Sequence, residues 1–237
     1  VINLVTVDGP VAGDVVFNHP DFSGLHFTGS TGVFRHLWQT IGQNIGQYKT
    51  YPRIVGETGG KDFIIAHRSA NVDEVVTGIV RGSFEFQGQK CSAASRVYLP
   101  DNLWPEIQEQ LTAEVATIKV GSPADPTNFM GAVISQRSFD KIKGYIEFAK
   151  NSPDADILCG GGCDDSVGYF VQPTVVLAKT PDFKTLEEEI FGPVVTLYVY
   201  PADEFDSALE LVDSTSEYAL TGAVFARERY AIDDAMR

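Results

Sequence analysis

The sequence is short of cysteine, of basic residues and of long apolar runs, and each shortage excludes a class of protein. Its three cysteines, Cys91, Cys159 and Cys163, are odd in number and lack the spacing of a disulfide framework, which favours a reducing compartment. Lys and Arg number 18 against 32 Asp and Glu, so the formal net charge is -14. A chain this acidic is a poor ligand for nucleic acid backbones and anionic membrane surfaces. No apolar run approaches the roughly 18 residues that a membrane-spanning helix needs.

What is present points to a folded α/β protein. Hydrophobic residues make up 43% of the 237 residues, enough to bury a sizeable core. Short apolar segments alternate with amphipathic segments of helical period, which is typical of the α/β class. The segment Phe63–Ala66 is apolar on both faces, as expected in a parallel sheet that is covered on both sides. A strand gives way to a Gly-Gly turn near residues 57–62, and we expect a domain boundary there.

The apolar pattern places the elements along the chain. We expect strands near residues 1–5, 25–28, 52–55, 63–66, 96–99, 169–177, 194–200 and 219–226. We expect helices near residues 34–45, 72–88, 103–115, 135–150, 205–212 and 229–237. Asn71 is expected to cap the second of these helices and Asp203 the fifth. Pro173 interrupts its strand, which predicts an edge strand or a bulge.

Both ends of the chain fall within segments that have the residue pattern of a strand or a helix. Val1 opens within a strand-like run, and Arg229–Arg237 reads as a helix cut in mid-pattern. We therefore expect the 237 residues to be an internal piece of a longer protein. The cysteine count predicts an intracellular location. Because any targeting segment would precede Val1, the bacterial cytoplasm and the mitochondrial matrix both stay open.

The segment Phe86–Ser92 places a cysteine just past a helix, among small and polar residues and next to Lys90. A cation close to a thiol favours the thiolate, which is the nucleophilic form. Composition alone favours an inert core cysteine. The polar setting separates Cys91 from Cys159 and Cys163 and makes it a candidate nucleophile.

The segment Gly56–Lys61 places a glutamate, Glu57, at the end of a strand and before a Gly-Gly turn. A carboxylate in such a place can point into a cleft and activate water. Taken alone, a solvated turn glutamate is the simpler interpretation.

The segment Phe27–Gly32 runs from a strand through small residues into a helix start. Such a turn directs backbone N–H groups and the positive end of a helix dipole toward a phosphate. It lacks the G-x-G-x-x-G pattern of ordinary dinucleotide-binding proteins, and a simple strand–helix turn explains it equally well.

The segment Glu188–Pro193 holds a carboxylate and an aromatic residue two positions apart, Glu189 and Phe191. These side chains could hold a ribose and pack against a flat ring. A charged helix end followed by a turn is an equally good interpretation.

We expect no metal site. The four histidines form no cluster with the spacing of metal ligands. Cys159 and Cys163 lack the second pair of ligands that a structural zinc site requires.

The four segments together resemble the aldehyde dehydrogenase superfamily in wording, order and spacing. The motifs are F-T-G-S at 27–30, E-x-G-G-K at 57–61, G-Q-x-C at 88–91 and E-E-I-F-G-P at 188–193, and Cys91 follows Glu57 by 34 residues. The resemblance spans essentially the whole chain. Further stretches, at 88–93, 163–171 and 211–215, resemble the branch that oxidises glutamate semialdehyde.

The resemblance implies an aldehyde dehydrogenase-like α/β fold with two parts. Residues 1–60 would be the C-terminal part of a Rossmann-type NAD-binding domain. Residues 61–237 would be the catalytic domain that bears the nucleophile, truncated at its C-terminus. The parent protein would be a homo-oligomer that acts on a small-molecule aldehyde, with no nucleic acid or membrane partner.

The resemblance also implies a role for each motif residue. Cys91 would be the catalytic nucleophile and Glu57 the base that activates water. NAD would be the cofactor, and Lys90 and Ser92 would line the substrate pocket. The cofactor-binding residues would be Gly29, Ser30, Thr31, Gly32, Glu189 and Phe191.

The implied reaction is the NAD-dependent oxidation of L-glutamate 5-semialdehyde, the open form of 1-pyrroline-5-carboxylate, to L-glutamate in proline catabolism. It would proceed through a thiohemiacetal and a thioester on the cysteine. Two alternatives stay open: another semialdehyde as substrate, or an inactive fragment that lacks half the cofactor site. Two residues depart from the common family pattern: Phe34 stands where many members carry glycine, and Thr58 stands where the family's E-L-G-G-K motif has leucine.

Overall fold

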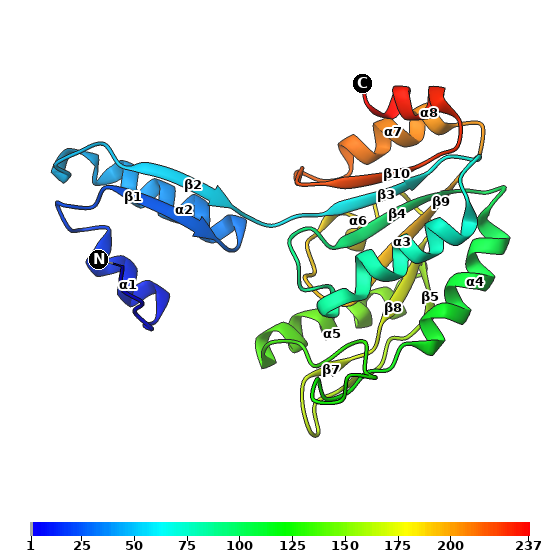
Figure 1. The fold of residues 1–237 in the computed structure, drawn as a ribbon, viewed down its shortest axis with the longest axis horizontal. Helices are drawn as coiled ribbons and strands as arrows, with labels where there is room; N and C mark the ends of the chain where they lie inside the picture. The colour runs from blue at the N-terminus through cyan, green and yellow to red at the C-terminus, as the bar shows by residue number, and fades with distance from the viewer. Residues whose placement is uncertain (1) are drawn as a thin grey trace. The chain divides into compact units, whose positions relative to one another are not determined.

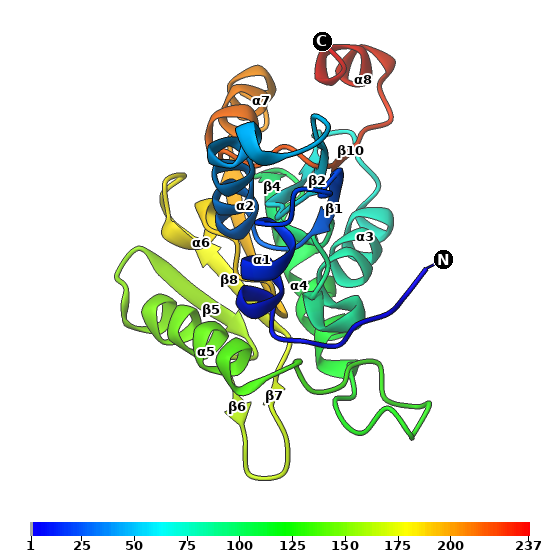
Figure 2. The same cartoon turned by 90° about the vertical axis from the view of Figure 1, so that its left-hand side faces the viewer.

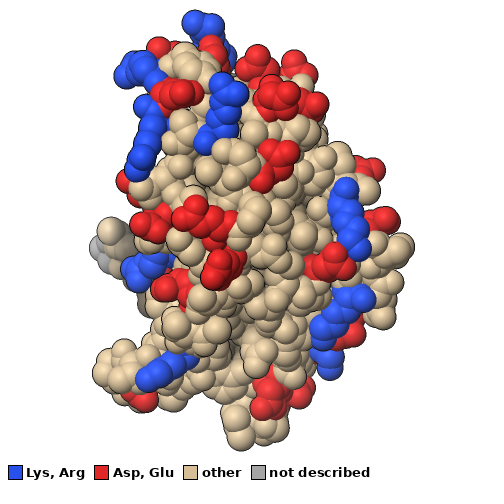
Figure 3. Space-filling view, turned by 90° about the vertical axis from the view of Figure 1, so that its right-hand side faces the viewer, with Lys and Arg blue, Asp and Glu red and all other residues tan. Residues whose placement is uncertain are grey.

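The structure is a computed structural model that describes residues 2–237. The chain divides into two compact units, Val1–Gly59 and Gly60–Arg237, called unit 1 and unit 2 below (Figure 1). No helix within the described residues is long and apolar enough to cross a membrane. The face drawn in Figure 3 carries Asp and Glu side chains interspersed with Lys and Arg. This face therefore lacks the continuous basic surface that binds a nucleic acid backbone.

Unit 1 is a small parallel β-α-β arrangement. Its elements are α1 (Gly9–Val16), β1 (Gly24–Thr28), α2 (Thr31–Gln43), the 3₁₀ turn η1 (Ile45–Gln47) and β2 (Arg53–Glu57). The two strands pair in parallel, with Thr28 opposite Glu57. The hydrophobic cluster of this unit has three buried members, Phe17, Phe22 and Ile41.

Unit 2 is built on a six-stranded sheet with the order β10-β3-β4-β9-β8-β5. Its strands are β3 (Asp62–Ala66), β4 (Ala94–Pro100), β5 (Ala155–Cys159), β8 (Thr174–Ala178), β9 (Val194–Tyr200) and β10 (Gly222–Phe225). Neighbouring strands run parallel except β5, which is antiparallel to β8. A separate short hairpin pairs β6 (Cys163–Asp164) with β7 (Phe170–Val171).

Helices cover both faces of this sheet. They are α3 (Val72–Phe84), α4 (Trp104–Thr117), α5 (Gln136–Asn151), α6 (Lys184–Glu187), α7 (Phe205–Ser214) and α8 (Arg229–Ala235), with a 3₁₀ segment η2 (Glu85–Gly88) after α3. Figure 2 shows α3 and α4 on one side of the strands and α5, α6 and α7 on the other. The continuous apolar runs of the strands follow from this, because both faces are buried.

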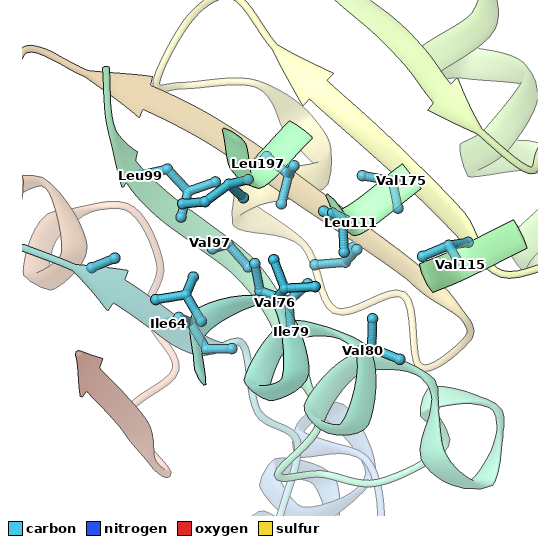
Figure 4. Packing of buried hydrophobic residues seen from close by; sticks show 14 of the residues in the cluster. Ile64, Val76, Ile79, Val80, Val97, Leu99, Leu111, Val115, Val175 and Leu197 are labelled. Atoms are coloured by element: carbon cyan, nitrogen blue, oxygen red, sulfur yellow. The ribbon is translucent and has the colours of Figure 1, made fainter. Parts of the chain in front are cut away.

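Alternate residues along the strands supply different hydrophobic clusters. Ile64, Val97 and Leu197 pack against α3 and α4 (Figure 4). Ile65 and Tyr98 belong to the cluster with α7 and α8 on the opposite face. A third cluster lies under α5. The period of two along each strand thus divides the core between the two faces.

Most of the expected elements are confirmed. β9 covers Val194–Tyr200 as expected, and Asn71 caps α3 by accepting a hydrogen bond from the backbone N–H of Glu74, 3.0 Å away. The helix expected to end at Gly88 instead ends at Phe84 and gives way to η2.

Four expectations about local structure are wrong or incomplete. The strand expected at the start is absent from residues 2–5: Ile2 and Leu4 are exposed, and no described strand pairs with them, while Val1 lies outside the described residues. The single strand expected at 169–177 is two strands of different sheets, β7 and β8, and Pro173 lies between them, so it marks neither an edge strand nor a bulge. Because β8 begins after it, the missing N–H of proline leaves the ladder intact between β9 and β5. The residue at the α7 N-cap is Glu204, not Asp203. α1, β5, β6 and α6 were not expected at all.

Candidate active site

Three of the four motif segments meet at one edge of the unit 2 sheet. β3, β4 and β9 are neighbouring parallel strands, so their amino ends share an edge. The segments that enter these strands are 59–61, 87–93 and 188–193. The backbone N–H of Gly60 donates a hydrogen bond to Oε1 of Glu189, 2.9 Å away. The sheet therefore brings together residues that are 129 positions apart in sequence.

Glycine is required at two positions of this edge. A Cβ on Gly60 would lie 2.0 Å from the carbonyl oxygen of Cys91. Gly88 has φ +63°, and a Cβ there would lie 2.4 Å from the carbonyl oxygen of Gly192. The loop that bears the candidate nucleophile is therefore in backbone contact with both neighbouring motif segments.

Cys91 is half-buried, and the two residues beside it are exposed. The Nζ of Lys90 donates a hydrogen bond to Oε2 of Glu85 at 3.0 Å, and Arg81 forms an ion pair with the same carboxylate. The lysine lowers the pKa of Glu85 through this hydrogen bond. The ammonium group of Lys90 is thus already paired within its own loop. Ser92 presents its side chain to solvent.

Helix α5 holds the segment that carries Glu189 and Phe191. The Nζ of Lys141 donates a hydrogen bond to the backbone oxygen of Glu189 at 2.7 Å. The hydroxyl of Tyr145 donates to Oε2 of Glu188 at 2.5 Å. Burial, and next this hydrogen bond, raise the pKa of Tyr145, so it stays a donor. Phe191 has φ +60° and is exposed, so its ring is presented outward from a strained turn.

Buried charge lies directly beneath this edge. Lys61 is 1% exposed, and its Nζ has no hydrogen-bond partner among the described residues. Burial lowers the pKa of Lys61 to about 7. Asp62 accepts a hydrogen bond at Oδ1 from the backbone N–H of Thr221 at 2.6 Å, and burial raises the pKa of its carboxyl group. Arg96 donates from Nε to the Lys61 carbonyl oxygen at 2.7 Å.

The remaining predicted residues lie in unit 1, at the carboxyl ends of its strands. Gly29 follows β1 and Glu57 is the last residue of β2. The backbone N–H of Gly29 donates to the Glu57 carbonyl oxygen at 3.1 Å. Ser30 caps α2 by accepting a hydrogen bond from the backbone N–H of Val33 at 3.4 Å. Cys91 and Glu57 thus belong to different units, each with part of the predicted site.

Phe34 has a clear place within unit 1. Its ring stacks on that of Phe27, with centroids 5.8 Å apart. A Cβ on Gly56 would lie 2.2 Å from the Phe34 ring. Gly56 on β2 therefore leaves the space that the Phe34 ring on α2 occupies.

Sequence reasoning missed the contributions of α5 and of the buried residues Lys61 and Asp62. The pattern at 135–150 predicts an amphipathic helix but assigns no role to its polar side chains. The available signal was weak: Lys141 and Tyr145 are four residues apart and so share one face of the helix. Within residues 2–237, no three His, Cys, Asp or Glu side chains come together to hold a metal ion.

Comparisons with known proteins agree on one family. The profile of the aldehyde dehydrogenase family matches residues 1–237. The chain is 53% identical over 237 residues to "Delta-1-pyrroline-5-carboxylate dehydrogenase, mitochondrial" of Dictyostelium discoideum and 49% identical over 238 residues to the human protein of the same name. These alignments cover 99% and 100% of the chain, and 42% of each relative.

Solved structures give the same result. The crystal structure of the delta-pyrroline-5-carboxylate dehydrogenase from Mycobacterium tuberculosis bound with NAD matches with a TM-score of 0.92 and 46% identity. The match covers 98% of this chain and 42% of that one. The chain therefore spans about two fifths of the length of the relatives it matches, and its fold is aldehyde dehydrogenase-like.

Proposed function

Because this chain belongs to the aldehyde dehydrogenase family, we propose that it is the central part of an NAD-dependent enzyme that oxidises L-glutamate 5-semialdehyde to L-glutamate. The names of the Dictyostelium and human relatives support the substrate, and the NAD-bound relative supports the cofactor. One observation in the structure supports it most directly. The loop of Cys91 touches both the turn at Gly60 and the Glu189–Gly192 segment through backbone contacts that only glycine permits.

The residues fit NAD in both units. In unit 1, a thirteen-residue helix begins at Thr31 next to small residues, and its first N–H groups and dipole suit a pyrophosphate. We assign Gly29, Ser30, Thr31 and Gly32 to that role. In unit 2, the Gly60 N–H occupies one lone pair of Glu189, and a carboxylate has further lone pairs for ribose hydroxyls.

Phe191 completes the proposed cofactor contacts in unit 2. Its exposed ring suits packing against the carboxamide end of the nicotinamide. When bound, NAD supplies the hydride acceptor that the oxidation requires.

The nucleophile in the proposed mechanism is Cys91. Its thiolate attacks the aldehyde carbon and forms a thiohemiacetal, and the backbone N–H of Cys91 donates to the oxyanion. Loss of hydride from this adduct leaves a thioester on the same sulfur. Glu57 takes a proton from water, whose oxygen attacks the thioester carbon. The C–S bond breaks, the acid leaves and the thiolate of Cys91 is restored, and Glu57 then releases its proton to solvent.

Lys90 and Ser92 are the proposed substrate contacts. The ammonium group of Lys90 suits the carboxylate end of glutamate semialdehyde. Since this group is paired with Glu85, substrate binding would exchange one carboxylate partner for another. That the parent is a homo-oligomer and works inside the cell, in the cytoplasm or the mitochondrial matrix, stays a prediction.

The test uses the full-length protein that contains these 237 residues. We expect NADH formation with glutamate semialdehyde and NAD, reduced more than about a thousandfold in Cys91→Ser, as when other enzymes lose their nucleophile. The matched control is Cys159→Ser, because burial raises the pKa of Cys159 and favours its unreactive thiol form. Full activity in Cys91→Ser would overturn the mechanism.

Substrate choice is tested by comparing kcat/KM for glutamate semialdehyde and succinic semialdehyde. A higher value for succinic semialdehyde would replace the proposed substrate while leaving the reaction class in place. The 237-residue chain by itself is expected to form little NADH, because it spans only 42% of the length of the Dictyostelium relative. Wild-type turnover by this piece would contradict that expectation.

A further inference from the structure

The segment before the candidate nucleophile has an unusual backbone. Phe86, Gln87 and Gly88 follow one another with φ of +52°, +58° and +63°. Left-handed backbone is ordinary for glycine but costly for Phe and Gln. Phe86 is 66% exposed, so burial of its ring does not account for its conformation. Another interaction must hold this turn three residues before Cys91.

The side chain of Gln87 supplies that interaction. Its Oε1 accepts a hydrogen bond from the backbone N–H of Gly131 at 3.0 Å. Its Nε2 donates to the backbone oxygen of Ala132 at 3.2 Å. One side-chain amide therefore binds both a donor and an acceptor of the same backbone segment, as a paired strand would. The residues that it joins are about 45 positions apart.

A second glutamine repeats the attachment two residues further on. The Oε1 of Gln89 accepts a hydrogen bond from the backbone N–H of Ile134 at 2.9 Å. Gln87 and Gln89 together join residues 86–91 to residues 131–134 by three hydrogen bonds. Ile134 is exposed, whereas Val133 beside it is buried in the hydrophobic cluster under α5, so the segment that the two glutamines bind is itself anchored in the core.

The segment 131–134 leads directly into α5. Ser135 caps this helix, and Lys141 and Tyr145 on its exposed face hold the Glu188–Gly192 segment. The loop of the nucleophile and the loop of the cofactor contacts are therefore both attached to one continuous stretch, residues 131–145. They also touch each other where Gly88 meets the Gly192 carbonyl.

We propose that Gln87 is a positioning residue, which holds the strained turn before Cys91 by pairing with the backbone of residues 131–132, with Gln89 as a second attachment. It acts on the reaction through Cys91 and touches neither substrate nor cofactor. The inference rests on the proposed function, because it assigns Cys91 as the nucleophile.

The central test compares two glycine substitutions in the full-length protein. Gln87→Gly and Phe86→Gly each relieve one left-handed residue, but only the first removes the attachment. We expect Gln87→Gly to lower kcat by about ten- to a hundredfold, since small misplacements of reacting groups are costly. KM for NAD should change much less. Phe86→Gly should keep kcat close to that of the wild type.

A readout without turnover accompanies the kinetics. The rate of alkylation of Cys91 by iodoacetamide, followed by peptide mass spectrometry, reports the setting of the thiol in the absence of NAD. We expect this rate to change several-fold in Gln87→Gly and not in Phe86→Gly, with Cys159 as the internal reference in every sample. Equal kinetics and equal alkylation in the two variants would overturn the proposal.

A second variant covers failure of Gln87→Gly to fold. Gln87→Glu keeps the acceptor for Gly131 but places an oxygen against the Ala132 carbonyl, so it should reproduce the loss of kcat in part. The two hypotheses fail separately. If the wild type forms no NADH but alkylation still distinguishes the glycine variants, the positioning stands and the proposed function fails. If the wild type is active and the variants match, only the positioning fails.

Discussion

The two units place their motifs at opposite ends of parallel strands. In unit 1 the motif residues lie at the carboxyl ends of β1 and β2, and α2 begins at Thr31 shortly after β1. In unit 2 they precede β3, β4 and β9, which are amino ends. Ligands of open α/β sheets usually bind at carboxyl ends. Unit 1 follows that rule, and the candidate nucleophile of unit 2 departs from it.

The difference shows what each kind of end provides. A carboxyl end that runs into a helix offers unpaired backbone N–H groups, which suit an anionic ligand. The amino ends of unit 2 are entered by three loops in mutual contact, so that glycine is needed at Gly60 and Gly88 and a lysine, Lys61, is enclosed. Unit 1 thus presents backbone groups, whereas unit 2 fixes side chains by tight packing.

The largest effect that tests this contrast is expected from a Gly→Ala substitution in each unit. Gly60→Ala would force its Cβ against the Cys91 carbonyl oxygen, 2.0 Å away. We expect kcat to fall by about a hundredfold, because the nucleophile must shift. Gly42→Ala, on α2 with no heavy atom within 4 Å of its Cβ, should instead stabilise unit 1 by about 0.5–1 kcal/mol. Normal turnover by Gly60→Ala would show that the amino-end loops adapt freely.

The next effect concerns the enclosed charge of unit 2. The pKa of Lys61 is about 7 in the folded protein, against an ordinary 10.5. Between these pH values the unfolded chain binds more protons, so the free energy of unfolding rises with pH. From pH 7 upward, the free energy of unfolding of the wild type should rise by roughly 1 kcal/mol per pH unit relative to that of Lys61→Met. Below pH 7, where Lys61 is charged in both states, the wild type should be destabilised relative to Lys61→Met by a constant amount.

The matched control for Lys61 lies in unit 1. Lys49 is exposed and pairs with Asp21. Denaturant titrations of Lys49→Met between pH 6 and about 10 should run parallel to those of the wild type, since exposed pairs contribute little. If the free energy of unfolding of Lys61→Met varied with pH in parallel with that of the wild type, the Lys61 ammonium group would be hydrated in the folded protein, contrary to the prediction.

A smaller effect is expected at the attachment of the cofactor segment to α5. Lys141→Met removes the donor to the Glu189 carbonyl oxygen. KM for NAD should rise roughly three- to tenfold, the value of one hydrogen bond, with less change in kcat. Lys143→Met, which changes an exposed lysine two residues away on α5, is the control. An equal effect of both variants would point to a general effect of charge.

The smallest effect is expected within unit 1. Phe34→Leu loses the stacking on Phe27 and should lower the stability of this unit by about 1 kcal/mol. Hydrogen exchange read separately for the two units should show faster exchange in β1 and β2 only. Val33→Ala, which changes an exposed residue of the same helix, should stay within about 0.5 kcal/mol of the wild type. Faster exchange across unit 2 as well would show that the units unfold together.

Much of the fold could be predicted because its signals are local. Strand and helix periods, and caps such as Asn71, depend on residues a few positions apart. The expectations that failed depend on neighbours. Residues 2–5 have the composition of a strand but no described partner to pair with, and β8 is interior because β5 lies beyond it.

The sequence by itself determined the identity and order of the four motifs, and with them the aldehyde dehydrogenase family. Only the tertiary structure decided what holds the motif residues. Gly60 meets Glu189 across 129 positions, Lys141 meets Glu189 across 48, and Gln87 meets Ala132 across 45. The sheet accounts for the first pair, because parallel strands gather their ends whatever their separation along the chain. The other two pairs depend on the packing of α5 and of Val133 before it against β8 and β9. The partners of these residues are therefore set by strand order and helix packing, which patterns of neighbouring residues do not contain.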